Sequence, residues 1–197
     1  MPVVLTTIPD PPVPPHPPRK RWTRAECAVF EQNGMWAGQH WELIEGEPIN
    51  KMGKNDPHIE GVAKIARELM AIFGWDRVRQ EPSIDVSPED NPTSEPEPDV
   101  IVFKSPTAKL RRHAANLALV VEVSDTTLTL DLTVKAGLYA RAGIADYWVL
   151  DVNGRRMIVH REPEAGIYKS VVEYAEYERV APLAATDHAL LVSDVLI

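Results

Sequence analysis

The sequence predicts an α/β or α+β fold in which helices flank a mixed central β-sheet. Residues 116–124 form a run of strand-forming residues, rich in Val and Leu, that is typical of a strand covered on both faces. Residues 57–74 carry apolar side chains at three- and four-residue spacing, which predicts an amphipathic helix that ends at Gly74. The remaining segments mix strand and helix patterns, with no internal repeat.

The other elements are expected in the following order. Thr23 and Glu26 have the spacing of a capping box, which predicts a short helix that ends near Gly34. A hairpin with Gly46 near its turn is expected at residues 41–52, and strands at residues 78–87 and 98–103. A helix from about Leu130 to Ala142 follows the central strand. After it come a second hairpin, at residues 146–151 and 156–160, and a last strand at residues 167–174. The apolar residues 189–197 are expected to pack on the core.

Length and composition predict one ordinary domain. The chain has 197 residues, and its hydrophobic content of 44% and charged content of 25% are typical of a globular protein. We expect a disordered proline-rich tail at residues 1–20 and a single domain at residues 21–197. The single Cys27 excludes an intramolecular disulfide and a Cys-rich zinc site. Without a signal-peptide or membrane-helix pattern, the expected location is cytoplasmic.

The net charge of −8 counts against a protein that coats nucleic acid by electrostatics alone. It does not exclude an enzyme that cuts nucleic acid, because a cluster of metal-binding carboxylates itself makes the chain acidic. Local basic patches would then contact DNA, and residues 19–21 and 104–112 are the candidates. Motifs of nucleotide-binding proteins and serine hydrolases are missing from the sequence.

Two carboxylates lie within or beside apolar runs. Glu122 is embedded in residues 117–123, where an unpaired charge would cost on the order of several kcal/mol. Asp99 opens the apolar run of residues 98–103. If the two strands pair, both side chains can converge on one Mg²⁺, with the backbone carbonyl of Val123 nearby. Alternatively, Asp99 only begins a strand at a surface turn, and Glu122 lies on an exposed edge.

The expected helix at residues 130–142 carries a third candidate. Asp131, Lys135 and Tyr139 are spaced by four residues and share one helix face. Either Asp131 and Lys135 form a surface ion pair, or the Lys135 ammonium lies over the metal site and steadies water or the scissile phosphate. Glu42 in the first hairpin and His58 in a helical first turn are further candidates, although a lone histidine there is more often a surface or packing residue.

Together these residues resemble the PD-(D/E)XK nuclease superfamily and, within it, the bacterial restriction-endonuclease family of the Uma type. The resemblance covers about residues 22–160. It depends on several segments in order, none specific alone: residues 41–47, Pro57-His58, Pro98-Asp99, residues 121–124, the helix with Asp131, Lys135 and Tyr139, and residues 143–151.

The resemblance implies a restriction-endonuclease-like fold and an endonuclease that hydrolyses DNA by means of metal-activated water. It implies that Mg²⁺ or Mn²⁺ is held by Asp99, Glu122 and the Val123 carbonyl, with assistance from Glu42. DNA is the implied substrate, no membrane is implied, and a homodimer is compatible with this interpretation.

One position departs from the superfamily pattern. The superfamily's lysine normally stands two residues after the Glu, where this chain has Ser124. The resemblance implies that Lys135 supplies the charge instead. The alternative function is a catalytically inactive interaction module that keeps the nuclease fold. The intact carboxylates and lysine favour the enzyme, and the net charge favours the module.

Overall fold

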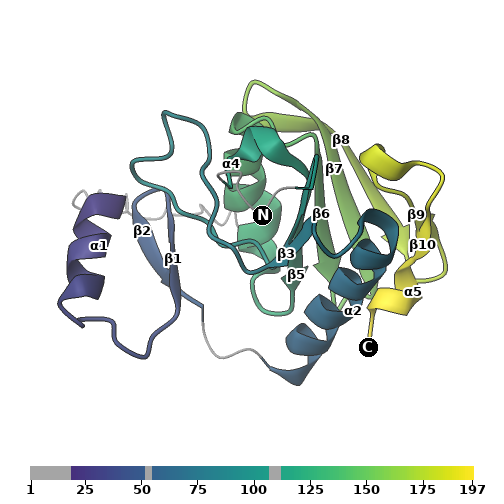
Figure 1. Cartoon of the computed structure of the whole chain (residues 1–197), viewed down its shortest axis with the longest axis horizontal. Helices are drawn as coiled ribbons and strands as arrows, with labels where there is room; N and C mark the ends of the chain where they lie inside the picture. Colours follow the sequence, from purple (N-terminus) through teal and green to yellow (C-terminus); the bar gives the residue numbers. More distant parts are fainter. Residues whose placement is uncertain (1–18, 52–54, 107–111) are drawn as a thin grey trace, which may run out of the picture.

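A computed structural model describes residues 19–51, 55–106 and 112–197 (Figure 1). Its elements are α1 (Arg24–Gln32), β1 (Trp41–Ile44), β2 (Glu47–Asn50), α2 (Asp56–Phe73), β3 (Val78–Gln80), β4 (Val100–Phe103), η1 (Ala114–Asn116), β5 (Leu117–Ser124), α3 (Leu128–Leu130), η2 (Asp131–Lys135), α4 (Ala136–Arg141), β6 (Asp146–Asp151), β7 (Arg156–Glu164), β8 (Ile167–Ala175), β9 (Arg179–Val180), η3 (Leu183–Ala185), β10 (Leu190–Leu191) and α5 (Val192–Val195). Most of the expected proline-rich tail, as well as the centre of the second basic segment, lies outside the described residues.

The main sheet has six strands in the order β3-β4-β5-β6-β7-β8. Strands β5 and β6 are parallel, and the other neighbouring pairs are antiparallel. This confirms the expected mixed sheet. All residues of β5 are buried, as the Val- and Leu-rich run predicted for a strand covered on both faces.

Helices cover the two faces of the sheet. On one face, Ile65, Leu69 and other apolar residues of α2 pack with β4, β5, β6 and the C-terminal segment around Val192 and Val195. The expected packing of the apolar C-terminus on the core is therefore confirmed. On the other face, Ala136 and Tyr139 of α4 pack on β5, β6 and β7. Figure 1 shows α2 beside the C-terminal elements, on the opposite side of the sheet from α4.

The N-terminal elements form as their sequence predicted. Thr23 and Glu26 make the expected capping box at the start of α1. Strands β1 and β2 form the expected antiparallel hairpin, and Gly46 has a φ of 80° in its turn. Leu43 of β1 exchanges backbone hydrogen bonds with Glu95, which fastens the hairpin to the loop that precedes β4.

Two expected elements differ from the structure. The strand expected at residues 78–87 covers only residues 78–80, because Glu81 has a φ of 51° and Pro82 has no amide hydrogen to donate. The helix expected from Leu130 begins at Leu128 and contains a π-helical turn at Asp131–Lys135. Such turns are rare and occur frequently at functional sites.

None of the helices in the described part of the chain is long and apolar enough to cross a membrane. That residues 21–197 form a single domain stays a prediction.

The first turns of α2 lie unusually close to β5. A Cβ atom added at Gly61 would lie 2.9 Å from Cγ1 of Val123, which is too close for a real contact. We expect Gly61→Ala to lower the free energy of unfolding by about 1–3 kcal/mol, because overpacking forces α2 away from the sheet.

Gly137→Ala is the matched control for this prediction. Its Cβ would meet no atom closer than 3.5 Å, so stability should stay equal or rise by up to about 1 kcal/mol. Urea denaturation followed by circular dichroism compares the two variants. Equal effects of both substitutions would show that α2 is free to shift at Gly61.

Candidate active site

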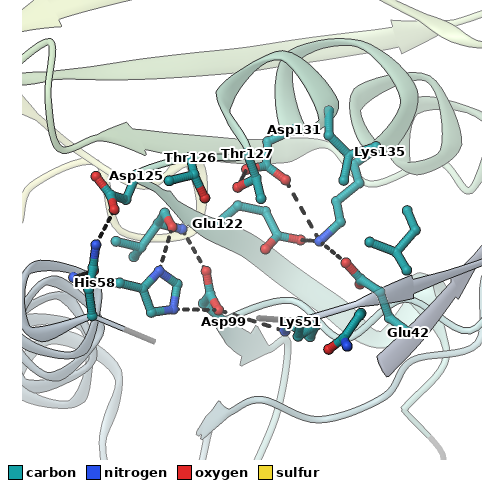
Figure 2. Close-up of a pocket in the computed structure, with 15 residues that line it drawn as sticks. Glu42, Lys51, His58, Asp99, Glu122, Asp125, Thr126, Thr127, Asp131 and Lys135 are labelled. Carbon is teal, nitrogen blue, oxygen red and sulfur yellow. Dashed lines mark hydrogen bonds and ion pairs between the residues drawn. The ribbon is translucent and has the colours of Figure 1, made fainter. Parts of the chain in front are cut away.

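A pocket of about 230 Å³ opens where β1, β4, β5, α2 and η2 meet. Its lining includes most of the ionisable candidates from the sequence. Figure 2 shows Asp99 between His58 and Lys51, with Glu122 between Asp99 and Lys135. The remaining polar residues around the pocket are Glu42, Asn50, Asn55, Asp125, Thr126, Thr127 and Asp131.

Asp99 and Glu122 come together through the pairing of β4 with β5. Val100 pairs with Val121, so the preceding residue, Asp99, lies beside Glu122 on the neighbouring strand. Both side chains are buried, with exposed fractions of 3% and 2%. The backbone N–H of Val123 donates a hydrogen bond to Oδ2 of Asp99 at 2.7 Å, which fixes the orientation of that carboxylate. The expectation that the two strands pair is confirmed, and the exposed-edge alternative for Glu122 is wrong.

Lys135 extends its ammonium into a cluster of carboxylates. Its Nζ lies 2.8 Å from Oε1 of Glu42, 3.1 Å from Oε1 of Glu122 and 3.7 Å from Oδ1 of Asp131. All four side chains are almost completely buried. The interpretation of Asp131 and Lys135 as a surface ion pair is therefore wrong, because the π-helical turn faces the sheet rather than solvent. A buried ammonium needs such partners, because removing it from water costs on the order of several kcal/mol.

Hydroxyl groups hold this cluster in place. Tyr139 donates a hydrogen bond to Oε1 of Glu122 at 2.7 Å. Ser124 and Thr127 donate to Oδ2 of Asp131 at 2.5 and 2.6 Å. Ser124 occupies the place where the superfamily usually has its lysine, and here it positions the carboxylate beside Lys135.

The hairpin contributes Glu42 from a distant part of the chain. Glu42 lies in β1 with an exposed fraction of 3%, and its Oε2 accepts a hydrogen bond from the backbone N–H of Glu97 at 3.0 Å. Its other oxygen meets Lys135. Glu42 therefore anchors the lysine and is itself anchored by the loop before β4.

His58 and Lys51 flank Asp99 on the side away from Lys135. Nδ1 of His58 lies 2.8 Å from the carbonyl oxygen of Val123, and Nε2 lies 3.3 Å from Oδ1 of Asp99. The Lys51 ammonium donates to the backbone carbonyl of Glu97 at 2.7 Å and stays 3.9 Å from Oδ1 of Asp99.

Burial and neighbouring charges shift the pKa values of the cluster. Burial raises the pKa of Glu122 to about 8, against the lowering effect of Lys135 and with the help of the nearby carboxylates. Burial alone would lower the pKa of Lys135, but Glu122, Glu42 and Asp131 hold it well above its usual range. Burial also acts to raise the pKa of Asp99, but His58, Lys51 and the Val123 amide outweigh this effect and leave it below its ordinary value.

The donor atoms of this pocket fit a hard divalent cation. Oδ1 of Asp99 is buried and has no hydrogen-bond partner among the described residues. Glu122 lies beside it, and Val123 also lines the pocket; its carbonyl oxygen has a second lone pair beyond its contact with His58. Mg²⁺ and Mn²⁺ bind through such oxygen ligands, and one or two carboxylates are the usual number for Mg²⁺.

All residues proposed from the sequence lie at this pocket: Asp99, Glu122, Val123, Lys135 and Glu42. The sequence alone did not reveal the place of His58 at this pocket, since a single histidine in a helical first turn does not show what its ring faces. It did not identify Glu81, whose carboxylate lies near Asp99 and His58. No sequence signal marks Glu81, because its place depends on the left-handed backbone after β3.

A mixed sheet with one acidic residue directly before β4, a second on β5 and a lysine beside them is typical of the class of restriction-endonuclease-like nuclease folds. The chain belongs to the Uma2 family, described as "Putative restriction endonuclease", whose sequence profile matches residues 30–190. Among curated proteins, none matches the sequence.

A solved structure supports the fold assignment. The fold is similar to that of a "putative nuclease belonging to DUF820" from Anabaena variabilis, with a TM-score of 0.60 and 17% sequence identity. The alignment covers 79% of this chain and 88% of that chain. At this identity, the similarity concerns the fold alone.

The raised pKa of Glu122 predicts a pH-dependent stability in metal-free buffer. Because the folded state binds this proton more tightly than the unfolded state, protonated Glu122 stabilises the fold at low pH, and this stabilisation is lost as the pH rises towards about 8. Glu122→Gln keeps a neutral side chain at every pH. The free energy of unfolding of Glu122→Gln should therefore rise relative to that of the wild type between about pH 5 and pH 8, by up to about 1.4 kcal/mol per pH unit.

Glu60→Gln, at an exposed position of α2, is the control and should run parallel to the wild type. Thermal and urea unfolding across this pH range provide the measurement. Parallel curves for Glu122→Gln and the wild type would show that Glu122 is ionised throughout.

Proposed function

We propose that the protein is a Mg²⁺- or Mn²⁺-dependent endonuclease that hydrolyses phosphodiester bonds of DNA. The observation that carries the proposal is the position of Lys135. Its ammonium lies 3.1 Å from Glu122, which is adjacent to Asp99 in one pocket. Two carboxylates for a cation and one ammonium for the phosphate are the parts that this hydrolysis requires.

Each of these residues has a separate task. Asp99, Glu122 and the Val123 carbonyl would hold the cation. A divalent cation at this place supplies Lewis-acid chemistry, which makes water a better nucleophile at neutral pH and polarises the phosphate. Tyr139 holds the Glu122 carboxylate in place through its hydrogen bond at 2.7 Å.

Lys135 would stabilise the negative charge that develops on the phosphate oxygens, or orient the attacking water. Its carboxylate partners keep the pKa high, so the side chain is charged at every pH at which the enzyme would act. Glu42 and Asp131 hold the ammonium from two sides, and this removes the need to order a flexible side chain during the reaction.

The backbone of DNA would approach over the open side of the pocket. Lys51 and Asn50 line the pocket and carry side-chain N–H groups of the kind that contact phosphate oxygens. These donors partly answer the objection that a net charge of −8 disfavours a nucleic-acid substrate.

A non-catalytic interaction module with the same fold is the alternative, and metal titration separates the two. An enzyme of the proposed kind binds Mg²⁺ or Mn²⁺, with or without DNA, whereas failure to bind either would support the module. A cytoplasmic location and a homodimer stay predictions from the sequence.

Plasmid nicking with Mn²⁺ tests the proposed reaction. The wild type should convert supercoiled plasmid to nicked and linear forms, and Glu122→Gln should abolish this conversion. Lys135→Gln should lower the rate by about a hundredfold, because one charged donor to the transition state is lost.

Lys169→Gln, at an exposed lysine of β8, is the control and should keep full activity. Circular dichroism would verify that each variant is folded at the assay temperature. Full activity of folded Lys135→Gln would contradict the proposed role of this lysine, and absence of nicking by the wild type with either metal would contradict the function.

The departure at Ser124 allows a rescue experiment. Ser124 lies two residues after Glu122 on the same face of β5, so a lysine there can reach the same carboxylates. Adding Ser124→Lys to Lys135→Gln should restore part of the nicking rate. Adding Ser124→Met instead, with a similar length and no charge, should restore none. Equal nicking rates for the two double variants would show that a positive charge at residue 124 does not replace the ammonium of Lys135.

A further inference from the structure

On the side of Asp99 that faces away from Lys135, two buried polar atoms lie opposite each other without a hydrogen bond. Nε2 of His58 and Oδ1 of Asp99 are 3.3 Å apart. Within the described parts of the chain, neither atom has a hydrogen-bond partner. Asp99 is only 3% exposed, so water does not readily compensate its carboxylate oxygen.

The hydrogen bonds on the far side of each group determine what these two atoms can do. The carbonyl oxygen of Val123 is an acceptor, so Nδ1 of His58, 2.8 Å away, must carry the hydrogen. In a neutral imidazole, Nε2 then presents a lone pair. Oδ2 of Asp99 accepts the Val123 amide, and Oδ1 presents a second lone pair. Two buried acceptors that face each other are unfavourable unless a cation binds between them or beside them.

A third ligand lies within reach. A carboxylate oxygen of Glu81, one atom of Asp99 and one of His58 all lie within 4.8 Å of one another. Glu81 follows β3, and its N–H donates to the backbone carbonyl of Asp99 at 3.0 Å, which keeps the two residues side by side. Glu81 also has a φ of 51°, a conformation that is uncommon for a residue with a side chain.

Lys51 is the cation that stands near this place in the described residues. Its ammonium is 3.9 Å from Oδ1 of Asp99, too far for a hydrogen bond, and it is held by the carbonyl of Glu97. Lys51 therefore reduces the negative potential at Asp99 without occupying the space between Asp99 and His58.

We propose that His58, Glu81 and Asp99 form a second divalent-cation site, separate from the position between Asp99 and Glu122. One imidazole nitrogen and two carboxylates suit Mn²⁺ and the later transition metals better than Mg²⁺, which prefers oxygen ligands alone. The site joins α2, the end of β3 and the start of β4, so an occupying ion ties the three elements together. The inference rests on the proposed function only in that Asp99 is shared by the two positions.

Electron paramagnetic resonance of Mn²⁺ counts bound ions without any need for nuclease activity. The wild type should bind two Mn²⁺ ions. Glu122→Gln should keep the ion at His58, whereas His58→Gln and Glu81→Gln should each weaken one of the two by at least about tenfold. Calorimetry with Mg²⁺ should show no change in affinity for His58→Gln and Glu81→Gln.

Two further variants sharpen the test. Lys51→Met removes the neighbouring ammonium and should tighten Mn²⁺ binding at the second site, because a competing positive charge is lost. His188→Gln, at an exposed histidine remote from the pocket, is the matched control and should bind as the wild type does. Addition of Mn²⁺ should raise the melting temperature of Glu122→Gln, but not that of Glu122→Gln combined with His58→Gln.

The outcomes separate this inference from the proposed function. Unchanged Mn²⁺ binding in both folded His58→Gln and folded Glu81→Gln would overturn the second site. Loss of all Mn²⁺ binding in Glu122→Gln would also overturn it, because only one shared site would exist. Two bound ions in a wild type that does not nick DNA would support the second site and contradict the endonuclease.

Discussion

The ammonium of Lys135 buried among carboxylates is the interaction on which the rest of the site depends. Burying an ammonium or a carboxylate alone is unfavourable, and the contact between the two offsets the cost of removing them from water. The contact joins Glu42 of the hairpin, Glu122 of the central sheet and Asp131 of the π-helical turn. Three segments that are distant along the chain are thus held at one place by one charge.

The surrounding fold supplies the rigidity that this charge cluster needs. Strand β5 is buried along its whole length, and Gly61 lets α2 approach its end closely enough for His58 to contact Val123. The same strand aligns Asp99 with Glu122 through the β4 pairing. A site built on paired strands and a closely packed helix keeps its geometry better than one on loops, and this suits chemistry that depends on fixed charges.

The ammonium of Lys135 reaches the carboxylates from a different element than the superfamily pattern predicts. Here it comes from η2 rather than from the position of Ser124, two residues after Glu122. What matters electrostatically is the distance of the ammonium from the carboxylates, not its place along the chain. Ser124 still contributes, because its hydroxyl orients the Asp131 carboxylate beside the lysine.

The sequence by itself determined the central strand and the amphipathic helix α2, because apolar runs and their spacing are local properties that report directly on burial. It also predicted Lys135, through four-residue spacing and the family resemblance. Only the tertiary structure decided that Asp131 and Lys135 are buried, and that the left-handed backbone at Glu81 aims a carboxylate at His58. Those features depend on contacts between residues far apart in the chain, and no local pattern records such contacts.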